Sequence, residues 1–245
     1  MHLLNTRPRE QGERLNEQIR CLGGIPISFP TLHIESTEWS HLAPPLDEAS
    51  HAIFTSANAV THFMNGLPKT ASKAWPSPIQ TTAIGLATAA AMAHHQLPVH
   101  HIPAVADSAH VLALDAFQTS HGQAILLIKG EGGLSLIQDG LTAKGATIIP
   151  LEVYRRKPVY YSPDAIRSLC QDTPIDIILF TSQEAMQQLA YLLGDTGKIW
   201  LCNKPCLVIS QRLANAAASL GISERLISPY NTLVDTLCAL WRKTT

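Results

Sequence analysis

The chain has 245 residues, 46% of them hydrophobic and 15% charged, which is enough to bury a core of ordinary size. A formal net charge of −1 argues against a general nucleic-acid-binding protein, which would normally be basic. We expect no signal peptide in MHLLNTRPRE and no membrane span, because no apolar run approaches the roughly 20 residues that a span needs. The five cysteines are typical of reduced thiols and lack the spacing of a zinc site, so we expect no bound metal.

Apolar segments that favour strands alternate along the chain with segments whose apolar residues recur at helical spacing. In the first part, strands are expected at residues 3–6, 25–30, 51–55, 81–85, 98–102, 124–129 and 146–154, and helices at 8–24, 57–66, 87–96, 107–118 and 132–144. In the second part, helices are expected at 164–171, 183–193, 211–221 and 233–243, and strands at 175–181, 206–210 and 224–228. Strands this apolar, alternating with helices, predict parallel sheets covered on both faces, so the fold class is α/β.

The sequence also repeats itself. Phe-Thr-Ser ends an apolar run at 54–56 and again at 180–182, residues 83–93 resemble 208–218, and residues 3–30 resemble 125–150. Three pairs at nearly constant spacing indicate two similar lobes. The alternative is that any two strand–helix units look alike.

Each copy of Thr-Ser stands where a strand is expected to end and a helix to begin. A helix N-terminus offers backbone N–H groups and suits an anion, and in α/β proteins ligands gather at the carboxyl ends of the strands. Ser56 and Ser182 are therefore candidates for ligand binding. The plainer alternative is that both serines only cap their helices.

Several segments, in this order, carry a resemblance to a known family: NTRPREQGERLNEQIRCLGG, FTSANAV, AIGLAT, LLIKGEGG, GLTAKGATIIPLEVYRRKP and FTSQEAM. Together they resemble the uroporphyrinogen-III synthases along nearly the whole chain. The resemblance implies a cytoplasmic, cofactor-free lyase of tetrapyrrole biosynthesis. It implies that hydroxymethylbilane is closed to uroporphyrinogen III with loss of water and inversion of the last pyrrole ring. We expect a monomer without nucleic-acid or membrane partners, with a transient handover of substrate from hydroxymethylbilane synthase.

The resemblance also implies the domain organisation. Two α/β lobes, each a parallel sheet flanked by helices, would be joined by a two-stranded antiparallel connector, with the active site in the cleft between the lobes. Lobe one would comprise residues 1–32 and 158–245, lobe two residues 36–152, and the connector strands residues 30–36 and 151–158.

Carried onto this sequence, the family's site residues fall mainly on the turns described above. Tyr154 matches the tyrosine that is assigned a catalytic part, and a phenol can donate a proton to a leaving hydroxyl. Donors to the carboxylates of the substrate would be Arg7, Ser56, Asn58, Thr88, Lys129, Gly130, Ser182 and Ser210. The alternatives stay open that Tyr154 packs against a lobe and that Arg7 is a surface arginine.

Two other classes of protein compete with this interpretation. A non-catalytic binder of an anionic small molecule would share the Thr-Ser turns and the two lobes but would not need Tyr154. A nucleotide-using α/β enzyme is disfavoured because no GxGxxG follows the first expected strand.

Overall fold

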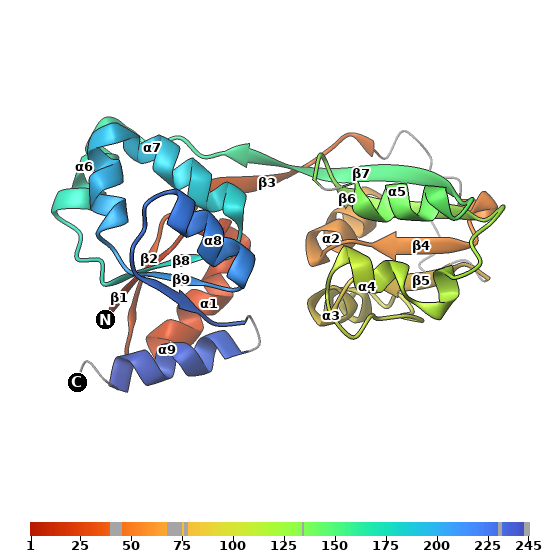
Figure 1. Cartoon of the computed structure of the whole chain (residues 1–245), viewed down its shortest axis with the longest axis horizontal. Helices are drawn as coiled ribbons and strands as arrows, with labels where there is room; N and C mark the ends of the chain where they lie inside the picture. The colour runs from red at the N-terminus through yellow and green to blue at the C-terminus, as the bar shows by residue number, and fades with distance from the viewer. Residues whose placement is uncertain (40–45, 68–74, 76–77, 134, 230–231, 243–245) are drawn as a thin grey trace. The chain divides into compact units, whose positions relative to one another are not determined.

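A computed structural model describes residues 1–39, 46–67, 75, 78–133, 135–229 and 232–242. The chain divides into two compact units, called unit 1 (residues 1–33 and 157–245) and unit 2 (residues 34–156). Each contains a five-stranded sheet with helices on both faces (Figure 1). The predicted α/β class with two similar lobes is confirmed. No helix in the described ranges combines the length and the apolar character that crossing a bilayer requires.

The sheet of unit 1 is entirely parallel and has the order β10-β9-β8-β1-β2. Its strands are β1 (His2–Asn5), β2 (Ile25–Ser28), β8 (Ile177–Phe180), β9 (Cys206–Val208) and β10 (Arg225–Ile227). Its helices are α1 (Arg9–Cys21), α6 (Pro163–Gln171), α7 (Gln183–Cys202), α8 (Gln211–Ser219) and α9 (Leu233–Arg242). Helix α7 is longer than predicted, because it continues after a kink at Gly194, where φ is 61°.

Alternate residues of these strands face opposite layers of helices. Leu4 and Ile178 pack in the core that α6, α7 and α8 cover, whereas Leu3 and Leu179 pack in the core under α1 and α9 (Figure 1). All four side chains are fully buried. The near-continuous apolar runs in the sequence thus reflect strands that are buried on both faces.

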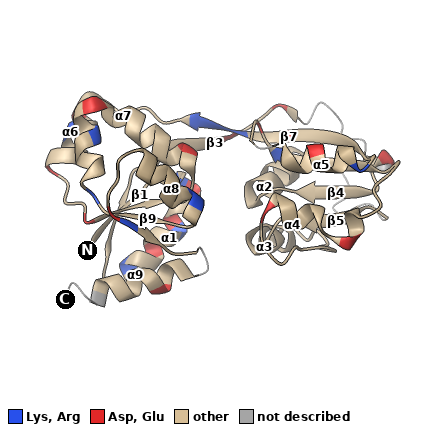
Figure 2. Ribbon diagram, viewed as in Figure 1, with Lys and Arg blue, Asp and Glu red and all other residues tan. Residues whose placement is uncertain are grey.

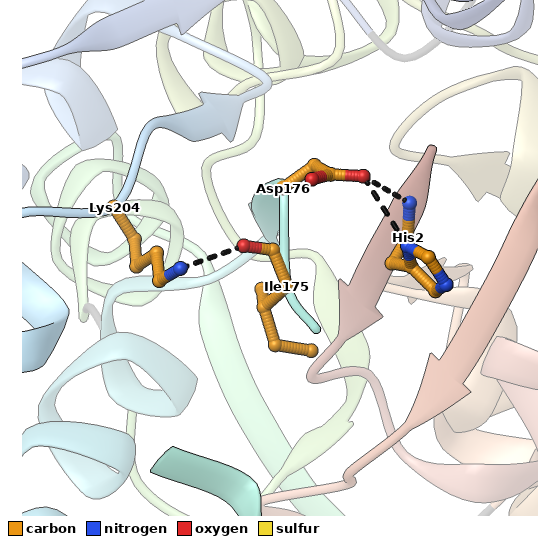
Figure 3. A network of polar contacts seen from close by, with 4 residues as sticks. All are labelled: His2, Ile175, Asp176 and Lys204. Atoms are coloured by element: carbon orange, nitrogen blue, oxygen red, sulfur yellow. Dashed lines mark hydrogen bonds and ion pairs between the residues drawn. The ribbon is translucent and has the colours of Figure 1, made fainter. Parts of the chain in front are cut away.

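Polar contacts fix the amino-terminal end of this sheet (Figure 3). The carboxylate of Asp176 accepts a hydrogen bond of 2.6 Å from the backbone N of His2, and this bond lowers the pKa of Asp176. Beside it, Lys204 Nζ donates to the carbonyl oxygen of Ile175 at 2.8 Å. The first bond joins β1 to the residue before β8, and the second joins the segment before β9 to the same residues before β8.

Unit 2 has the sheet order β3-β7-β6-β4-β5. Its strands are β3 (Leu32–Ser36), β4 (His51–Phe54), β5 (Gln80–Ala83), β6 (Ala124–Gly130) and β7 (Thr147–Pro158). Its helices are α2 (Ala57–Gly66), α3 (Leu86–His94), α4 (Ser108–Leu112) and α5 (Leu136–Ala143), with short 3-10 helices η2 (Leu46–Glu48) and η3 (Asp115–Phe117). Helices α2 and α3 cover one face of the sheet, and α4, η3 and α5 cover the other.

Strands β3 and β7 run antiparallel and carry the chain between the two units. The backbone N of Thr37 donates to the carbonyl of Val153, and that of Val159 donates to the carbonyl of Thr31, at 3.2 and 2.9 Å. The partner's number falls as the residue number rises, which is the pattern of an antiparallel pair.

The repeat read from the sequence is present in the sheets. The order β9-β8-β1-β2 in unit 1 corresponds to β5-β4-β6-β7 in unit 2. The strands that end in Phe-Thr-Ser, β8 and β4, hold equivalent places and are each followed by a helix. Two unrelated strand–helix units would not be expected to share this order.

The prediction of a strand at 98–102 was wrong. Only a single β-bridge forms there, between Thr82 and His101. The backbone N–H of Thr81, which would continue a ladder, donates instead to Nδ1 of the His100 ring at 3.0 Å. An imidazole therefore takes the place of a backbone carbonyl at this edge.

The single helix predicted at 107–118 was also wrong, because the chain forms α4 and then η3. Leu114 lies between them with an extended backbone. Val111 and Phe117 are both fully buried in one core cluster. In a continuous helix these positions would point roughly 120° apart, so the break lets both side chains reach the same core.

Candidate active site

Polar turns follow the carboxyl ends of the strands in each unit, at the edge of the sheet where α/β proteins commonly bind ligands. The predicted site residues near these ends are Ser56, Asn58, Thr88, Lys129 and Gly130 in unit 2, and Arg7, Ser182 and Ser210 in unit 1.

Ser56, Ser182 and Ser210 are the N-cap residues of α2, α7 and α8. Each hydroxyl oxygen accepts a hydrogen bond from the backbone N–H three residues later, at 3.0, 3.1 and 3.3 Å respectively. A serine hydroxyl in this role keeps its own proton and a second lone pair. Each cap can therefore donate to a further acceptor while it holds its helix.

A β-bulge sets the direction of Tyr154. Lys129 pairs with Glu152 across β6 and β7, but Gly130 pairs with Tyr154, so the register shifts by one residue there. Val153 and Tyr154 are neighbours in sequence, yet both are buried in the core under α2 and α3. Regular alternation would have placed them on opposite faces.

The hydroxyl of Tyr154 has two polar partners from its own unit. It lies 3.1 Å from Ser56 Oγ, and Arg156 Nη2 donates to it at 3.1 Å. The residue is only 2% exposed. The ring is thus part of the core, and its polar end lies at the start of α2.

The ring of Tyr154 fits against a glycine and a histidine. A Cβ at Gly130 would lie 2.6 Å from Cζ of the tyrosine, so only glycine leaves room for the ring in this position. The imidazole of His62 stacks on the ring, with centroids 5.6 Å apart, and its Nδ1 lies 2.7 Å from Ser36 Oγ. Ring orientation is therefore constrained by β6, α2 and β3.

Lys129 contributes to a different part of unit 2. Its Nζ lies 3.5 Å from Oε1 of Glu152, and the same oxygen accepts from the backbone N of Gly132 at 3.3 Å. A carboxylate of the chain itself thus lies against the glycine-rich turn. The hollow beside it, of about 540 Å³, is lined by Thr37, Glu38, Trp39, Lys129, Gln138, Pro150 and Glu152.

The other predicted donors lie in the first turns of helices or beside them. Thr88 is 3% exposed in the first turn of α3, and Asn58 is half-buried in the first turn of α2. Arg7 is half-buried, and its backbone N donates to Oδ1 of Asn5 at 3.2 Å. Asn5 in turn donates to Asn16 Oδ1 at 2.8 Å, so a buried amide pair fixes the turn after β1.

A family model described as Uroporphyrinogen-III synthase HemD matches residues 13–237. The chain belongs to the uroporphyrinogen-III synthase family. It is 31% identical over 229 residues to the uroporphyrinogen-III synthase of Escherichia coli (strain K12), covering 90% of this chain and 92% of that one. The uroporphyrinogen-III synthase of Salmonella typhimurium is 29% identical over 228 residues, with the same coverage.

Solved structures of uroporphyrinogen-III synthases share the fold. A mutant enzyme from the extremely thermophilic bacterium Thermus thermophilus has a TM-score of 0.65 at 17% identity, covering 99% of this chain and 98% of that chain. The enzyme from Helicobacter pylori 26695 has a TM-score of 0.67 at 15% identity, with the same coverage. The predicted family is confirmed, and with it the activity of a hydro-lyase in tetrapyrrole biosynthesis.

Two neighbours of Tyr154 were not among the predicted site residues. Arg156 follows it by two positions in a strand, and residues two apart share a face, so alternation alone could have indicated the contact. No sequence signal points to His62, because its contact with the ring depends on how α2 packs on the sheet. Over the ranges that the structure describes, no group of three or more histidine, cysteine, aspartate or glutamate side chains could hold a metal ion.

Proposed function

We propose that this uroporphyrinogen-III synthase acts on hydroxymethylbilane and that the Tyr154 hydroxyl assists departure of the substrate's hydroxyl group. The observation that supports this role is the placement of the phenol between Ser56 and Arg156, each 3.1 Å away. One partner is an N-cap at the carboxyl edge of the sheet and the other is a permanent cation. Because the ring belongs to the core, the proposed role belongs to the hydroxyl alone.

The reaction requires a proton donor and strict control of geometry. Donation of the phenolic proton to the leaving hydroxyl releases water and leaves a cationic azafulvene. The last ring attacks through its substituted carbon to form a spiro intermediate, which fragments and recloses. The closing pyrrole carbon then loses a proton, which restores the phenol. General acid catalysis assists the first step, and positioning selects the attack that inverts the ring.

The carboxylates of the substrate are assigned to helix N-termini and to a few cations. In unit 2 we assign Ser56, Asn58, Thr88, Lys129 and Gly130, and in unit 1 Arg7, Ser182 and Ser210. The serine caps support this assignment, because each keeps a hydroxyl proton beside the backbone N–H groups of a first helical turn, at the positive end of the helix. For Lys129 the substrate would have to replace Glu152 as the partner.

We also propose a cytoplasmic, monomeric enzyme that receives its substrate from hydroxymethylbilane synthase. All five cysteines are free thiols, as is typical of a reducing compartment. Hydroxymethylbilane closes without inversion in water, so a short path between the two enzymes would protect it.

The test is to incubate the pure protein with freshly generated hydroxymethylbilane and to separate the oxidised products by chromatography. We expect the type III isomer; type I alone would favour the non-catalytic binder. Tyr154→Phe keeps the ring and should lower kcat by roughly 100-fold or more, while unfolding free energy falls by only about 1–2 kcal/mol.

Tyr160→Phe provides the matched control, since Tyr160 is 77% exposed and outside the proposed site. This substitution should leave kcat and the unfolding free energy unchanged. If Tyr154→Phe kept the wild-type kcat, Tyr154 would be a packing residue.

A further inference from the structure

The basic run at the end of unit 2 contains two arginines in unlike surroundings. It is the stretch of β7 drawn in blue in Figure 2. Arg155 Nε lies 3.4 Å from Oε2 of Glu35, with a side chain that is 45% exposed. Arg156 instead has its guanidinium carbon 5.4 Å from the centre of the Tyr154 ring and donates to the phenolic oxygen. Two equal charges on adjacent residues therefore contact different partners.

The contact with Arg156 limits how the phenol can use its proton. A guanidinium has only donors and stays protonated, so in this bond the phenolic oxygen must accept. The phenolic proton then points elsewhere, toward Ser56 Oγ or toward a substrate in its place. Ser56 Oγ already accepts from Ala59 N and still has a lone pair available. Arg156 thus donates a hydrogen bond to Tyr154, and Tyr154 donates one to Ser56 or to the substrate.

The guanidinium also lies where charge would develop. As the phenolic proton moves to the leaving hydroxyl, negative charge builds on the phenolic oxygen, 3.1 Å from Nη2. A cationic donor already bonded to that atom stabilises the transition state more than the ground state. An effect of this kind lowers the barrier without changing how tightly the substrate binds.

We propose that Arg156 is a positioning residue for Tyr154, which directs the phenolic proton toward the substrate and stabilises the charge that its loss creates. The inference depends on the proposed role of Tyr154. The competing role is direct binding of a substrate carboxylate by the guanidinium. The two roles predict different kinetics. Removing a carboxylate contact that substrate and transition state share raises KM, whereas removing a positioning residue lowers kcat.

The experiment compares Arg156→Gln, Arg156→Lys and Arg155→Gln in the wild-type and Tyr154→Phe backgrounds, with hydroxymethylbilane as substrate. Arg156→Gln should lower kcat by about 10- to 100-fold, the value of a charge-assisted hydrogen bond, with KM within about twofold. Arg156→Lys keeps the charge and a donor and should recover part of the activity. Arg155→Gln removes the same charge and should match the wild type. In the Tyr154→Phe background, Arg156→Gln should cost nothing further.

Three results would overturn the inference: a raised KM at unchanged kcat, a decrease in kcat that adds to that of Tyr154→Phe, or an equal decrease in Arg155→Gln. Thermal melts of each variant show whether it is folded, and activity in Arg156→Lys shows that the backbone tolerates a change there. Failure of the proposed function would look different, since the wild type would then form no type III product or Tyr154→Phe would keep full activity.

Discussion

Ser56 has two roles that a single substitution removes together. Its oxygen accepts from the backbone N of Ala59 at 3.0 Å, and it lies 3.1 Å from the Tyr154 hydroxyl. Ser162 has only the first of these roles, because it caps α6, accepts from Ala165 N at 3.2 Å and is not part of the proposed site. Ser56→Ala and Ser162→Ala therefore form a matched pair.

The expected decrease in unfolding free energy follows from these contacts. Removal of an N-cap costs about 1 kcal/mol, and a buried hydrogen bond contributes about 1 kcal/mol more. Ser162→Ala should therefore cost about 1 kcal/mol, and Ser56→Ala about 1–2 kcal/mol. In the variant the Tyr154 oxygen still accepts from Arg156, but the phenolic proton and the Ala59 N–H both lose the Ser56 hydroxyl as acceptor.

Urea unfolding followed by circular dichroism would measure the stability of both variants, and steady-state turnover would measure activity. We expect Ser56→Ala to lower kcat by several-fold and Ser162→Ala to leave it unchanged. If the two variants were destabilised equally and both kept full activity, the Ser56–Tyr154 bond would contribute neither to stability nor to catalysis. If the units unfold in separate transitions, each variant should shift only the transition of its own unit.

Two further predictions concern packing and pH. A Cβ at Gly24 would lie 1.8 Å from Trp241 Cζ2, so Gly24→Ala should displace α9 and lower unfolding free energy by at least about 2 kcal/mol; an unchanged thermal midpoint would contradict this. Burial, followed by the charges of His101 and His100, holds the pKa of His51 below its ordinary 6.5. The folded state then favours the neutral ring. The stability that His51 contributes in this way is fully present above pH 6.5 and is lost as the pH falls through the pKa of the folded state. Urea melts at several pH values should show a shallower acid destabilisation in His51→Gln, and identical profiles would argue against the assignment.

The periodicity of apolar residues was sufficient to predict most strands and helices of the fold. The apolar strands and the helices between them follow from residues that each sit in a regular element, such as Leu4 in β1 and Leu189 in α7. It failed where a side chain replaced a backbone group. His100 accepts the hydrogen bond that a strand carbonyl would have taken, and apolar patterning carries no sign of that exchange.

The candidate site was predictable in part. A serine after an apolar run marks a helix start, and Ser56, Ser182 and Ser210 are all N-caps. The bond between Ser56 and Tyr154 joins residues that are far apart in sequence, and it depends on the bulge opposite Gly130. Alternation along β7 would have placed Tyr154 opposite to Val153, so three-dimensional information was needed to find the pair.

The strand order of unit 1 has a consequence for how the chain matures on the ribosome. Strand β1 lies between β2, which is made at once, and β8, which is made only after all of unit 2. Unit 2 is one continuous stretch and can close its sheet first, since domains generally fold as units during synthesis. Until residues 177–180 emerge, one edge of β1 has no partner for its backbone N–H and C=O groups, so the nascent enzyme must carry an open strand edge through most of its translation.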